Sequence, residues 1–557
     1  MHSRPESAAT PPPVGAWAAL VSCLLAVFMQ MLDTTIVNIA IPDLTTGLGA
    51  ASSQQLLILS VYTLAFACTL LTATTIGSRY GRRRVFVLAL LGFAAASTLC
   101  GIAQSPWQLI AFRALQGVSA ALVSAQTLAL IADIFPRSRH GVVFGIYGAV
   151  AGVAAMLGPV LGGVLVSLDV FGWGWRTIFL VNIPVSVVAA VMALRYMPRQ
   201  RGSRDLAVDG VGVVASTVGL FMLIYPLAVG REQDWPAHLW VMIAVAVVVL
   251  AAFVVHEHRL PRRGGAPLLR VDLFSSRQFA VGAVLSLLFF SMFAAFFFTM
   301  SVATQFGLGW SALRTGLITM PFAAGAIVGS LASASAVRHL GPRTLTVGMV
   351  LLAVGLAWVA AELAPESARV DVPSLIAPLV LGGLGTGLFV APLQATILSG
   401  SDEHTVGSAS GLIPTVQQLG ASLGLAVITI FFFSQVSHTA VTAVPGATAG
   451  LSRALQDTDV APTLRPFVAS NFARCARAQL ESAHPERPAS GCSTTAPSGG
   501  ARAQVLAAAT PDLRAAARQA AAWTFVGALR TSLYLSAGLA TLVAACSLLL
   551  RRSTGGR

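Results

Sequence analysis

The sequence has little charge and no lysine. Only 10% of its 557 residues are charged, whereas an ordinary soluble domain has about 25%, so the chain lacks the polar side chains that would cover a soluble globule. Without lysine the phosphate-binding pattern G-x-x-x-x-G-K-[ST] cannot occur, which argues against ATP-driven work by this chain. The sequence also has no H-E-x-x-H pattern and no cysteine pairs at zinc spacing. We therefore expect no metal, no cofactor and no enzymatic activity.

Long hydrophobic runs make up most of the chain. Hydrophobic residues account for 56% of it and the mean hydropathy is +0.78, which excludes compositional disorder, collagen and a disulfide-rich secreted scaffold. A spanning helix needs about 20 mostly apolar residues. We predict an all-α polytopic membrane protein whose 14 transmembrane helices lie near 16–41, 54–76, 85–104, 106–132, 141–167, 177–197, 208–229, 237–256, 279–305, 312–337, 344–362, 374–398, 407–434 and 526–550.

The net charge of +14 could indicate a nucleic-acid partner, but the positions of the arginines favour a different explanation. Short loops after the even-numbered runs carry arginines, whereas those after the odd-numbered runs are nearly neutral or acidic; the loop at 399–406 is the exception. Arginine in short loops marks the cytoplasmic side of a membrane protein. The abundant alanine and arginine are typical of a GC-rich bacterial genome. We expect a multi-pass protein of a bacterial plasma or inner membrane, with both termini cytoplasmic and no nucleic acid bound.

A weak repeat divides the chain. Tyr80-Gly81-Arg82-Arg83 follows the second run and Leu340-Gly341-Pro342-Arg343 follows the tenth. This predicts two six-helix halves with two inserted helices, and we place an N-terminal bundle at 1–200, the inserted helices at 201–260 and a C-terminal bundle at 261–557. Repeated bundles around a site at the membrane midplane are typical of transporters.

The stretch 435–525 is polar, and we expect it to form an extracytoplasmic loop within the C-terminal bundle. It contains Cys475 and Cys492, and an oxidising compartment would allow a disulfide between them. The sequence leaves open whether they pair. Nothing in it requires more than a monomer.

Asp33 lies well inside the first apolar run, where an unpaired charge costs several kcal/mol. Burial favours the neutral form of a carboxyl, and a neighbouring arginine favours the carboxylate. A carboxyl between these two effects could bind and release a proton near neutral pH. The alternative is a structural aspartate that is hydrogen-bonded to the helix backbone or to a hydroxyl group.

Arg113 is the one arginine that the sequence places deep inside a run, in the fourth. An unpaired arginine in hydrocarbon is unfavourable, so this side chain should face a cavity, backbone carbonyls or Asp33. Our hypothesis is that Arg113 tunes proton binding by Asp33. A permanent structural ion pair is the alternative.

Two further patterns indicate how helices pack and what they enclose. In the fifth run, small residues allow close helix approach and a proline kinks the helix, at Gly158, Pro159, Gly162 and Gly163. The ninth run carries phenylalanines at helical spacing, which either line an apolar cavity or pack between helices. We predict a substrate cavity lined by Thr34, Asn38, Gln116, Phe289, Phe293, Phe297 and Gln305.

A cluster after the second run could act as a cytoplasmic gate. Gly81, Arg82 and Arg83 stand on a tight turn, and Asp133 ends the fourth run on the same side. An ion pair between Arg82 and Asp133 could hold one conformational state closed. A purely topogenic role explains the arginines almost as well.

These motifs, in this order, resemble those of the fourteen-helix drug:proton antiporters of the major facilitator superfamily. The run Leu32–Pro42 is similar to the helix-one motif of that family, and Arg113 with Gln116-Gly117 is similar to its helix-four motif. Gly158-Pro159 with Gly162-Gly163 resembles the helix-five antiporter motif, and Trp175–Pro184 resembles the entry into helix six. In the loop after helix two the usual glycine and aspartate of the family are replaced by Thr74 and Ser78. The resemblance therefore does not extend to the loop aspartate that holds the opposite bundle in that family.

The resemblance implies a secondary exporter that exchanges inward protons for hydrophobic, drug-like molecules, with the proton gradient as its energy source. Two alternatives remain open at this point. The same scaffold could export an endogenous metabolite, siderophore or lipid, or the chain could be a membrane receptor or assembly protein that uses its outer loop and transports nothing.

Overall fold

The computed structural model describes residues 15–549 except 51, 137–138, 170–171, 201, 203–208, 231–232, 264, 266, 366–369, 400–405, 459 and 483–500. The described residues are almost entirely helical and include no strand, as the sequence predicts. The helical elements are α1 (Ala16–Leu48), α2 (Ser52–Tyr80), α3 (Arg82–Gly101), α4 (Pro106–Ile134), α5 (His140–Leu168), η3 (Gly174–Arg176), α6 (Thr177–Leu180), α7 (Asn182–Tyr196), α8 (Gly210–Val229), α9 (Ala237–Arg259), η4 (Pro261–Arg263), η5 (Val271–Ser275), α10 (Arg277–Val302), η6 (Ala303–Gly307), α11 (Ala312–Ile318), α12 (Met320–Leu340), α13 (Arg343–Glu362), α14 (Val372–Ser399), α15 (Val406–Ala454), η8 (Leu455–Asp457), α16 (Arg465–Leu480) and α17 (Ala501–Ser547).

The long apolar helices coincide with the predicted runs. Within the described part of the chain, thirteen helices are long and apolar enough to cross a bilayer, and each matches one run. The run at 141–167 corresponds to α5, of which His140–Ala154 is found as a shorter apolar helix. The polytopic all-α class is therefore confirmed, whereas the number of fourteen spans stays a prediction.

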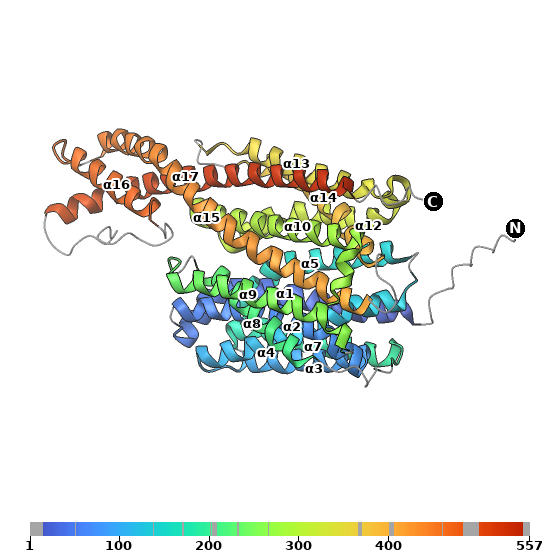
Figure 1. Cartoon of the computed structure of the whole chain (residues 1–557). Helices are drawn as coiled ribbons and strands as arrows, with labels where there is room; N and C mark the ends of the chain where they lie inside the picture. The colour runs from blue at the N-terminus through green and yellow to red at the C-terminus, as the bar shows by residue number, and fades with distance from the viewer. Residues whose placement is uncertain are drawn as a thin grey trace.

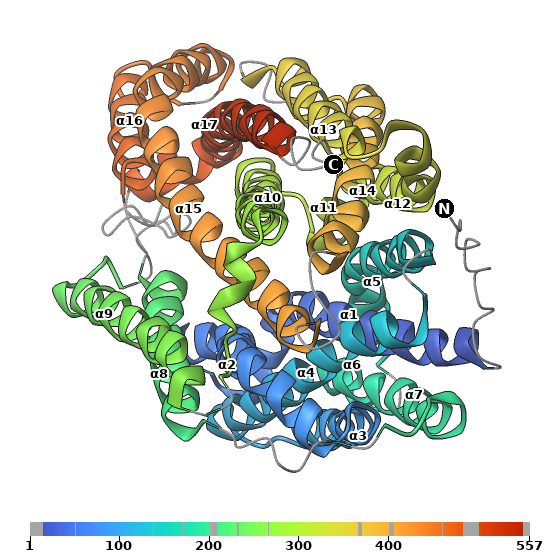
Figure 2. The same cartoon turned by 45° about the vertical axis from the view of Figure 1, so that its right-hand side comes forward.

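Two groups of helices pack side by side (Figures 1 and 2). In the first group, α4 lies against α2 and α3, while α1 lies against α5 and α7; in the second, α14 lies against α12 and α13, while α15 lies against α10 and α17. The groups meet along two seams, one where α5 contacts α12 and α14, and one where α2 contacts α15. The helix α8 contacts both α2 and α15, so the α8–α9 pair lies on this second seam.

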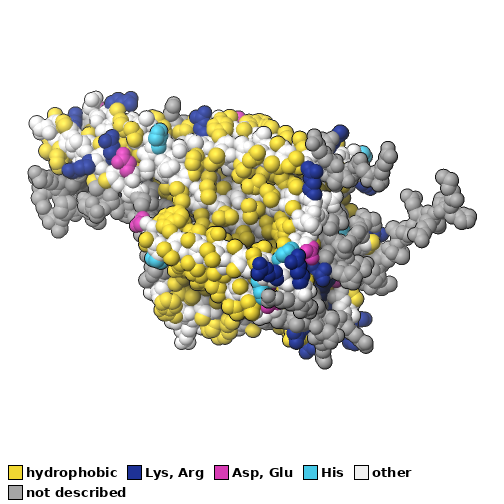
Figure 3. Space-filling model, viewed as in Figure 1, with side chains coloured by type: hydrophobic (Ala, Val, Ile, Leu, Met, Phe, Trp, Pro, Cys, Tyr) yellow, Lys and Arg dark blue, Asp and Glu magenta, His cyan; other side chains and the backbone are white. Residues whose placement is uncertain are grey.

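Hydrophobic side chains cover the middle of the molecule in the view of Figure 3, and charged side chains gather toward its ends. The helix α9 contributes strongly to this apolar surface, because Val241, Val247 and Val248 are 60%, 58% and 68% exposed. A helix that turns so much valine outward would be unfavourable in water and is suited to contact with lipid.

The described residues of the predicted outer loop, 435–525, are largely helical. The helix α15 continues to Ala454, α16 follows, and α17 begins at Ala501. Alanine, the strongest helix former, is abundant in this stretch, and α16 buries Val468, Phe472 and Leu480. We call the outer parts of α15 and α17 together with α16 the helical extension. It projects beyond the other helices at one end of the molecule, whereas α1 begins and α17 ends at the other end (Figure 1).

Candidate proton and substrate site

A buried carboxylate lies at the centre of the first group of helices. Asp33 on α1 is fully buried, and its two oxygens accept three hydrogen bonds. Arg113 on α4 donates to Oδ2 over 2.6 Å, while Gln116 on α4 and Asn182 on α7 donate to Oδ1 over 2.8 and 2.9 Å. All three donors are N–H groups that can only donate, so both oxygens of Asp33 act as hydrogen-bond acceptors in this conformation.

Arg113 has further polar and aromatic partners besides Asp33. Its guanidinium also donates to Gln116 Oε1 over 2.8 Å and to the Ile58 carbonyl oxygen over 3.5 Å, and it lies 4.3 Å from the centre of the Tyr62 ring. The side chain is 2% exposed. A buried ion pair is stable only when further hydrogen bonds compensate for the water that both charges have lost, and this pair has them.

The close crossing of α2 and α4 explains why Arg113 reaches so many partners. Gly117 lies four residues after Arg113, and a Cβ at this position would stand only 2.3 Å from the Tyr62 carbonyl oxygen. Only glycine permits this approach. It brings the Tyr62 ring and the Ile58 carbonyl of α2 against the guanidinium.

The sequence did not identify two members of this network. Ser97 on α3 accepts hydrogen bonds from Gln116 and from Asn182, both over 3.1 Å, and donates to the Phe179 carbonyl oxygen over 2.8 Å. Asn182 stands in the run Trp175–Pro184 that resembles the entry into helix six, but the sequence predicts no role for it. Each of the two is a polar residue among apolar neighbours in its own helix, and this pattern is the signal that could have revealed them.

The network presents only hydrogen-bond donors to Asp33. Four neutral or cationic side chains from α3, α4 and α7 surround the one carboxylate on α1. A protonated Asp33 would be a hydrogen-bond donor as well as an acceptor, so it would no longer match three N–H donors. Every partner in this network belongs to the first group of helices, among the residues that the structure describes.

The helix α5 contacts α1 directly beside Asp33. A Cβ at Gly158 would stand 1.8 Å from Thr35 Oγ1 and 3.2 Å from the backbone nitrogen of Ile36. Gly162 is buried, and a Cβ at Gly163 would meet no atom within 4 Å. The side chain of Pro159 lies outside the described residues.

The other end of α5 packs closely against α12 at the first seam. A Cβ at Gly145 would stand 2.6 Å from the Ser330 carbonyl oxygen of α12, and one at Gly148 would stand 3.3 Å from Ser330 Oγ. The same helix therefore packs closely on the opposite group and on the turn that follows Asp33.

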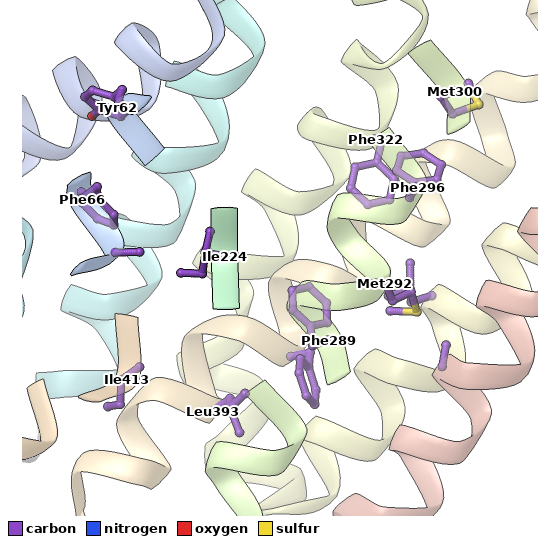
Figure 4. Packing of buried hydrophobic residues seen from close by; sticks show 14 of the residues in the cluster. Tyr62, Phe66, Ile224, Phe289, Met292, Phe296, Met300, Phe322, Leu393 and Ile413 are labelled. Carbon is purple, nitrogen blue, oxygen red and sulfur yellow. The ribbon is translucent and has the colours of Figure 1, made fainter. Parts of the chain in front are cut away.

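The predicted aromatic stripe packs inside the second group of helices, where Figure 4 shows Phe289 among other buried side chains. The ring centre of Phe289 lies 5.1 Å from that of Phe389 on α14, and Phe293 stacks on Phe289 at 5.7 Å. Phe297 and Phe293 approach Phe322 on α12 at 5.8 and 6.5 Å. A small cavity beside this cluster is lined by Met292, Phe293, Phe296, Phe322, Leu352, Leu356 and Thr386. In this conformation the stripe therefore joins helices, and Phe293 also borders the cavity.

The other predicted cavity residues are dispersed. Thr34 is exposed and donates to the Gln30 carbonyl oxygen over 2.9 Å, whereas Gln116 belongs to the Asp33 network. Gln305 lies in the π-helix η6 and donates to Ser301 Oγ over 2.6 Å. The side chain of Asn38 lies outside the described residues.

The cluster predicted to act as a cytoplasmic gate makes the contact that its charges suggest. Arg82 forms an ion pair with Asp133, which also accepts a hydrogen bond from Gln200 over 2.9 Å, and Arg83 donates to the Leu194 carbonyl oxygen. Gly81 has a φ of 92°, a conformation that favours glycine. These contacts tie together α3, α4 and the segment around α7, all within the first group of helices.

In the helical extension, Cys475 lies on α16 and forms a disulfide. Cys492 lies outside the described residues, so the pairing of Cys475 with Cys492 stays a prediction.

The sequence is similar to known transport proteins. The family model of the Major Facilitator Superfamily matches residues 23–425. The probable actinorhodin transporter of Streptomyces coelicolor is 34% identical over 488 residues, which cover 87% of this chain and 84% of that protein. The tetracenomycin C resistance and export protein of Streptomyces glaucescens is 31% identical over 442 residues, which cover 78% of this chain and 80% of that protein.

The fold is similar to that of a solved transporter. The crystal structure of the human organic anion transporter MFSD10 matches with a TM-score of 0.53 and covers 75% of this chain and 93% of that one. The two sequences are 17% identical, so this likeness concerns the fold alone.

Proposed function

The chain belongs to the major facilitator superfamily, and we propose that it exports hydrophobic, drug-like molecules in exchange for protons. Relatives that are 34% and 31% identical over the aligned residues are named as exporters or probable transporters of antibiotics, such as those for actinorhodin and tetracenomycin C. By analogy, the substrate class of this chain is an antibiotic or a molecule of similar size and apolarity.

The observation that carries the proposal is the buried carboxylate Asp33 and its donors. An ionised acid inside the apolar part of a membrane protein is expensive to maintain and marks proton or substrate pathways. Asp33 would bind the proton, and Arg113 would hold it ionised in the state seen here. A movement that separates α1 from α4 and α7 would remove N–H donors and favour protonation.

Alternating access supplies such a movement. In transporters built from two bundles, one bundle rocks against the other around a central site. The helix α5 would carry the rocking to Asp33, because Gly145 packs on Ser330 of α12 and Gly158 packs on Thr35 of α1. The ion pair of Arg82 with Asp133 would stabilise the outward-facing state.

The aromatic cluster is the proposed place for the apolar part of the substrate. Its lining has one hydroxyl group, from Thr386, among apolar and aromatic side chains. Such a surface would select for planar, hydrophobic groups over charged ones. We propose that the chain acts as a monomer in a bacterial plasma or inner membrane, with both termini cytoplasmic and two inserted helices between six-helix halves.

Vesicles test proton coupling directly. Inverted membrane vesicles from a pump-deficient host would be loaded with acid, and uptake of ethidium would be followed by fluorescence. We expect the wild-type chain to accumulate the dye in response to the pH gradient, and Asp33→Asn to abolish this uptake. The matched control is Asp371→Asn, which removes an exposed carboxylate outside the helices.

Uptake that remained unchanged in Asp33→Asn would remove Asp33 from the mechanism. A growth panel in the same host, with antibiotics and with extracts of endogenous metabolites, would separate a drug exporter from a metabolite exporter. If no compound moved but deletion of the helical extension changed the phenotype of the host, the partner-binding alternative would be favoured instead.

A further inference from the structure

Glu257 on α9 is a buried acid that the export cycle leaves unused. Among the described residues, the buried charged side chains are Asp33, Arg113 and Glu257. Asp33 and Arg113 neutralise each other, but no ion pair of Glu257 is found in the described part of the chain. Its exposure is 1%, so an uncompensated charge here would be strongly disfavoured.

The two oxygens of Glu257 have different surroundings. Oε2 accepts a hydrogen bond over 2.9 Å from the backbone N–H of Leu269, which precedes η5. Oε1 is buried and receives no hydrogen bond from any donor that the structure describes. It lies near another carboxyl group, that of Asp209, because both carboxyl groups border Gly212.

Asp209 lies at the N-terminus of α8, opposite the end of α9. Its Oδ1 accepts from the Val211 N–H over 3.1 Å, and its Oδ2 lies 2.8 Å from His256 Nε2. Asp209 Oδ2 and Glu257 Oε1 border the same small space, since each would stand 2.4 Å from a Cβ placed at Gly212. Gly212 therefore leaves room for the two carboxyl groups to meet.

We propose that Asp209 and Glu257 share one proton and form a second proton-binding site, separate from Asp33. Two carboxylate oxygens that face each other without a donor repel, and a single proton between them converts the repulsion into a hydrogen bond. Glu257 carries the proton because it is the more buried of the two acids. Asp209 accepts the hydrogen bond from Glu257; it also accepts from the Val211 N–H at the start of α8 and lies 2.8 Å from His256 Nε2.

Among the side chains that the structure describes, no other charge takes the place of this proton. The elements packed against α9 are α8, η4 and η5. The charged residues on or next to these elements and on the same end of α9 are Asp209, His256, His258, Arg259, Arg262, Arg263, Arg270 and Asp272, of which the side chain of Arg263 lies outside the described residues. His256 faces Asp209, and within the described part of the chain none of the arginines forms an ion pair with Glu257.

The shared proton would link three segments of the chain. Asp209 caps the N-terminus of α8, Glu257 lies in the last turn of α9, and Leu269 lies in the segment that leads into α10. The helix α8 also contacts α2 and α15, where the two groups of helices meet. Loss of the proton at alkaline pH would place a second negative charge in the pair, loosen the base of α8 and α9, and free the segment before α10.

Infrared spectroscopy of the purified full-length protein in lipid nanodiscs tests the shared proton. At neutral pH we expect the carbonyl band of a protonated carboxylic acid that disappears in Glu257→Gln and persists in Asp33→Asn. Glutamine keeps an N–H donor toward Asp209, so this variant should fold. Asp209→Asn provides a second route, because its amide would donate to Glu257 and remove the same band.

Glu362→Gln is the matched control, since this exposed glutamate also lies at a helix end and accepts a hydrogen bond from Trp358 Nε1 over 3.0 Å. It should leave the band unchanged. Amide hydrogen exchange at Leu269, corrected for the intrinsic effect of pH, should rise at alkaline pH in the wild type and stay constant in Glu257→Gln. A full-intensity band in Glu257→Gln, or no such band in the wild type at neutral pH, would overturn the proposal. Neither readout depends on transport.

Discussion

The pair of Asp33 and Arg113 should behave as one energetic unit, and a double-mutant cycle can measure it. Arg113→Met leaves Asp33 buried with two of its three hydrogen bonds and no cation. Removing one partner of a buried pair costs about 3–5 kcal/mol. Asp33→Asn should cost less, about 1–3 kcal/mol, because Arg113 keeps its contacts with Gln116, the Ile58 carbonyl and the Tyr62 ring.

The double variant removes both charges and should be less destabilised than the sum of the single variants. We expect a coupling energy of about 2–3 kcal/mol, near the upper end of values for residues in contact. The free energy of unfolding would be measured by denaturant titration in mixed micelles, and dye transport would be measured on the same four proteins. The pair of Arg82 and Asp133 provides the internal control, because their side chains are 16% and 30% exposed and such pairs contribute about 0.2–1 kcal/mol. Additive effects at the buried pair, within about 0.5 kcal/mol, would refute the coupling.

Three further substitutions test the remaining parts of the site. Gly117→Val should force α4 away from α2, lower the stability by about 1–3 kcal/mol and abolish transport; an unchanged melting temperature would contradict the close crossing. Asn182→Leu removes a donor from Asp33 and should shift the pH dependence of dye uptake to more alkaline values, whereas a purely structural role predicts a lower melting temperature with an unchanged profile. Phe293→Ala should raise the KM for planar aromatic substrates several-fold and leave that for small aliphatic ones unchanged, whereas an equal effect on both classes would argue against an aromatic subsite.

The transmembrane helices could be predicted because each is encoded by a contiguous apolar run. Their ends were less predictable. The helix α15 continues to Ala454, twenty residues beyond the predicted run, and α17 begins at Ala501 rather than near 526. Both extensions are rich in alanine, which favours helix without adding the hydrophobicity by which spans were recognised. The run at 312–337 is divided into α11 and α12, and Pro321 stands in the first turn of α12.

The charged members of the site could be predicted, but its neutral members could not. Asp33 and Arg113 stand out because charge is rare inside apolar runs. Asn182 and Ser97 are ordinary residues for a membrane helix, and only the packing of α3 and α7 against α1 and α4 gives them a shared partner. A buried position for Glu257 could not be predicted for a simpler reason: the predicted eighth run ends at 256, one residue before this acid.

The length of α15 has a consequence for how movement could be observed. This helix runs from the middle of the molecule into the helical extension over 49 residues, a length of about 74 Å at 1.5 Å per residue. A tilt of about 10° around its midpoint would carry the outer end through about 6 Å for a straight helix of that length. A small tilt of α15 would therefore produce a measurable displacement of the helical extension. A pair of distance probes, one on the extension and one on α1, would report movement of the two groups of helices and leave the substrate path free of labels.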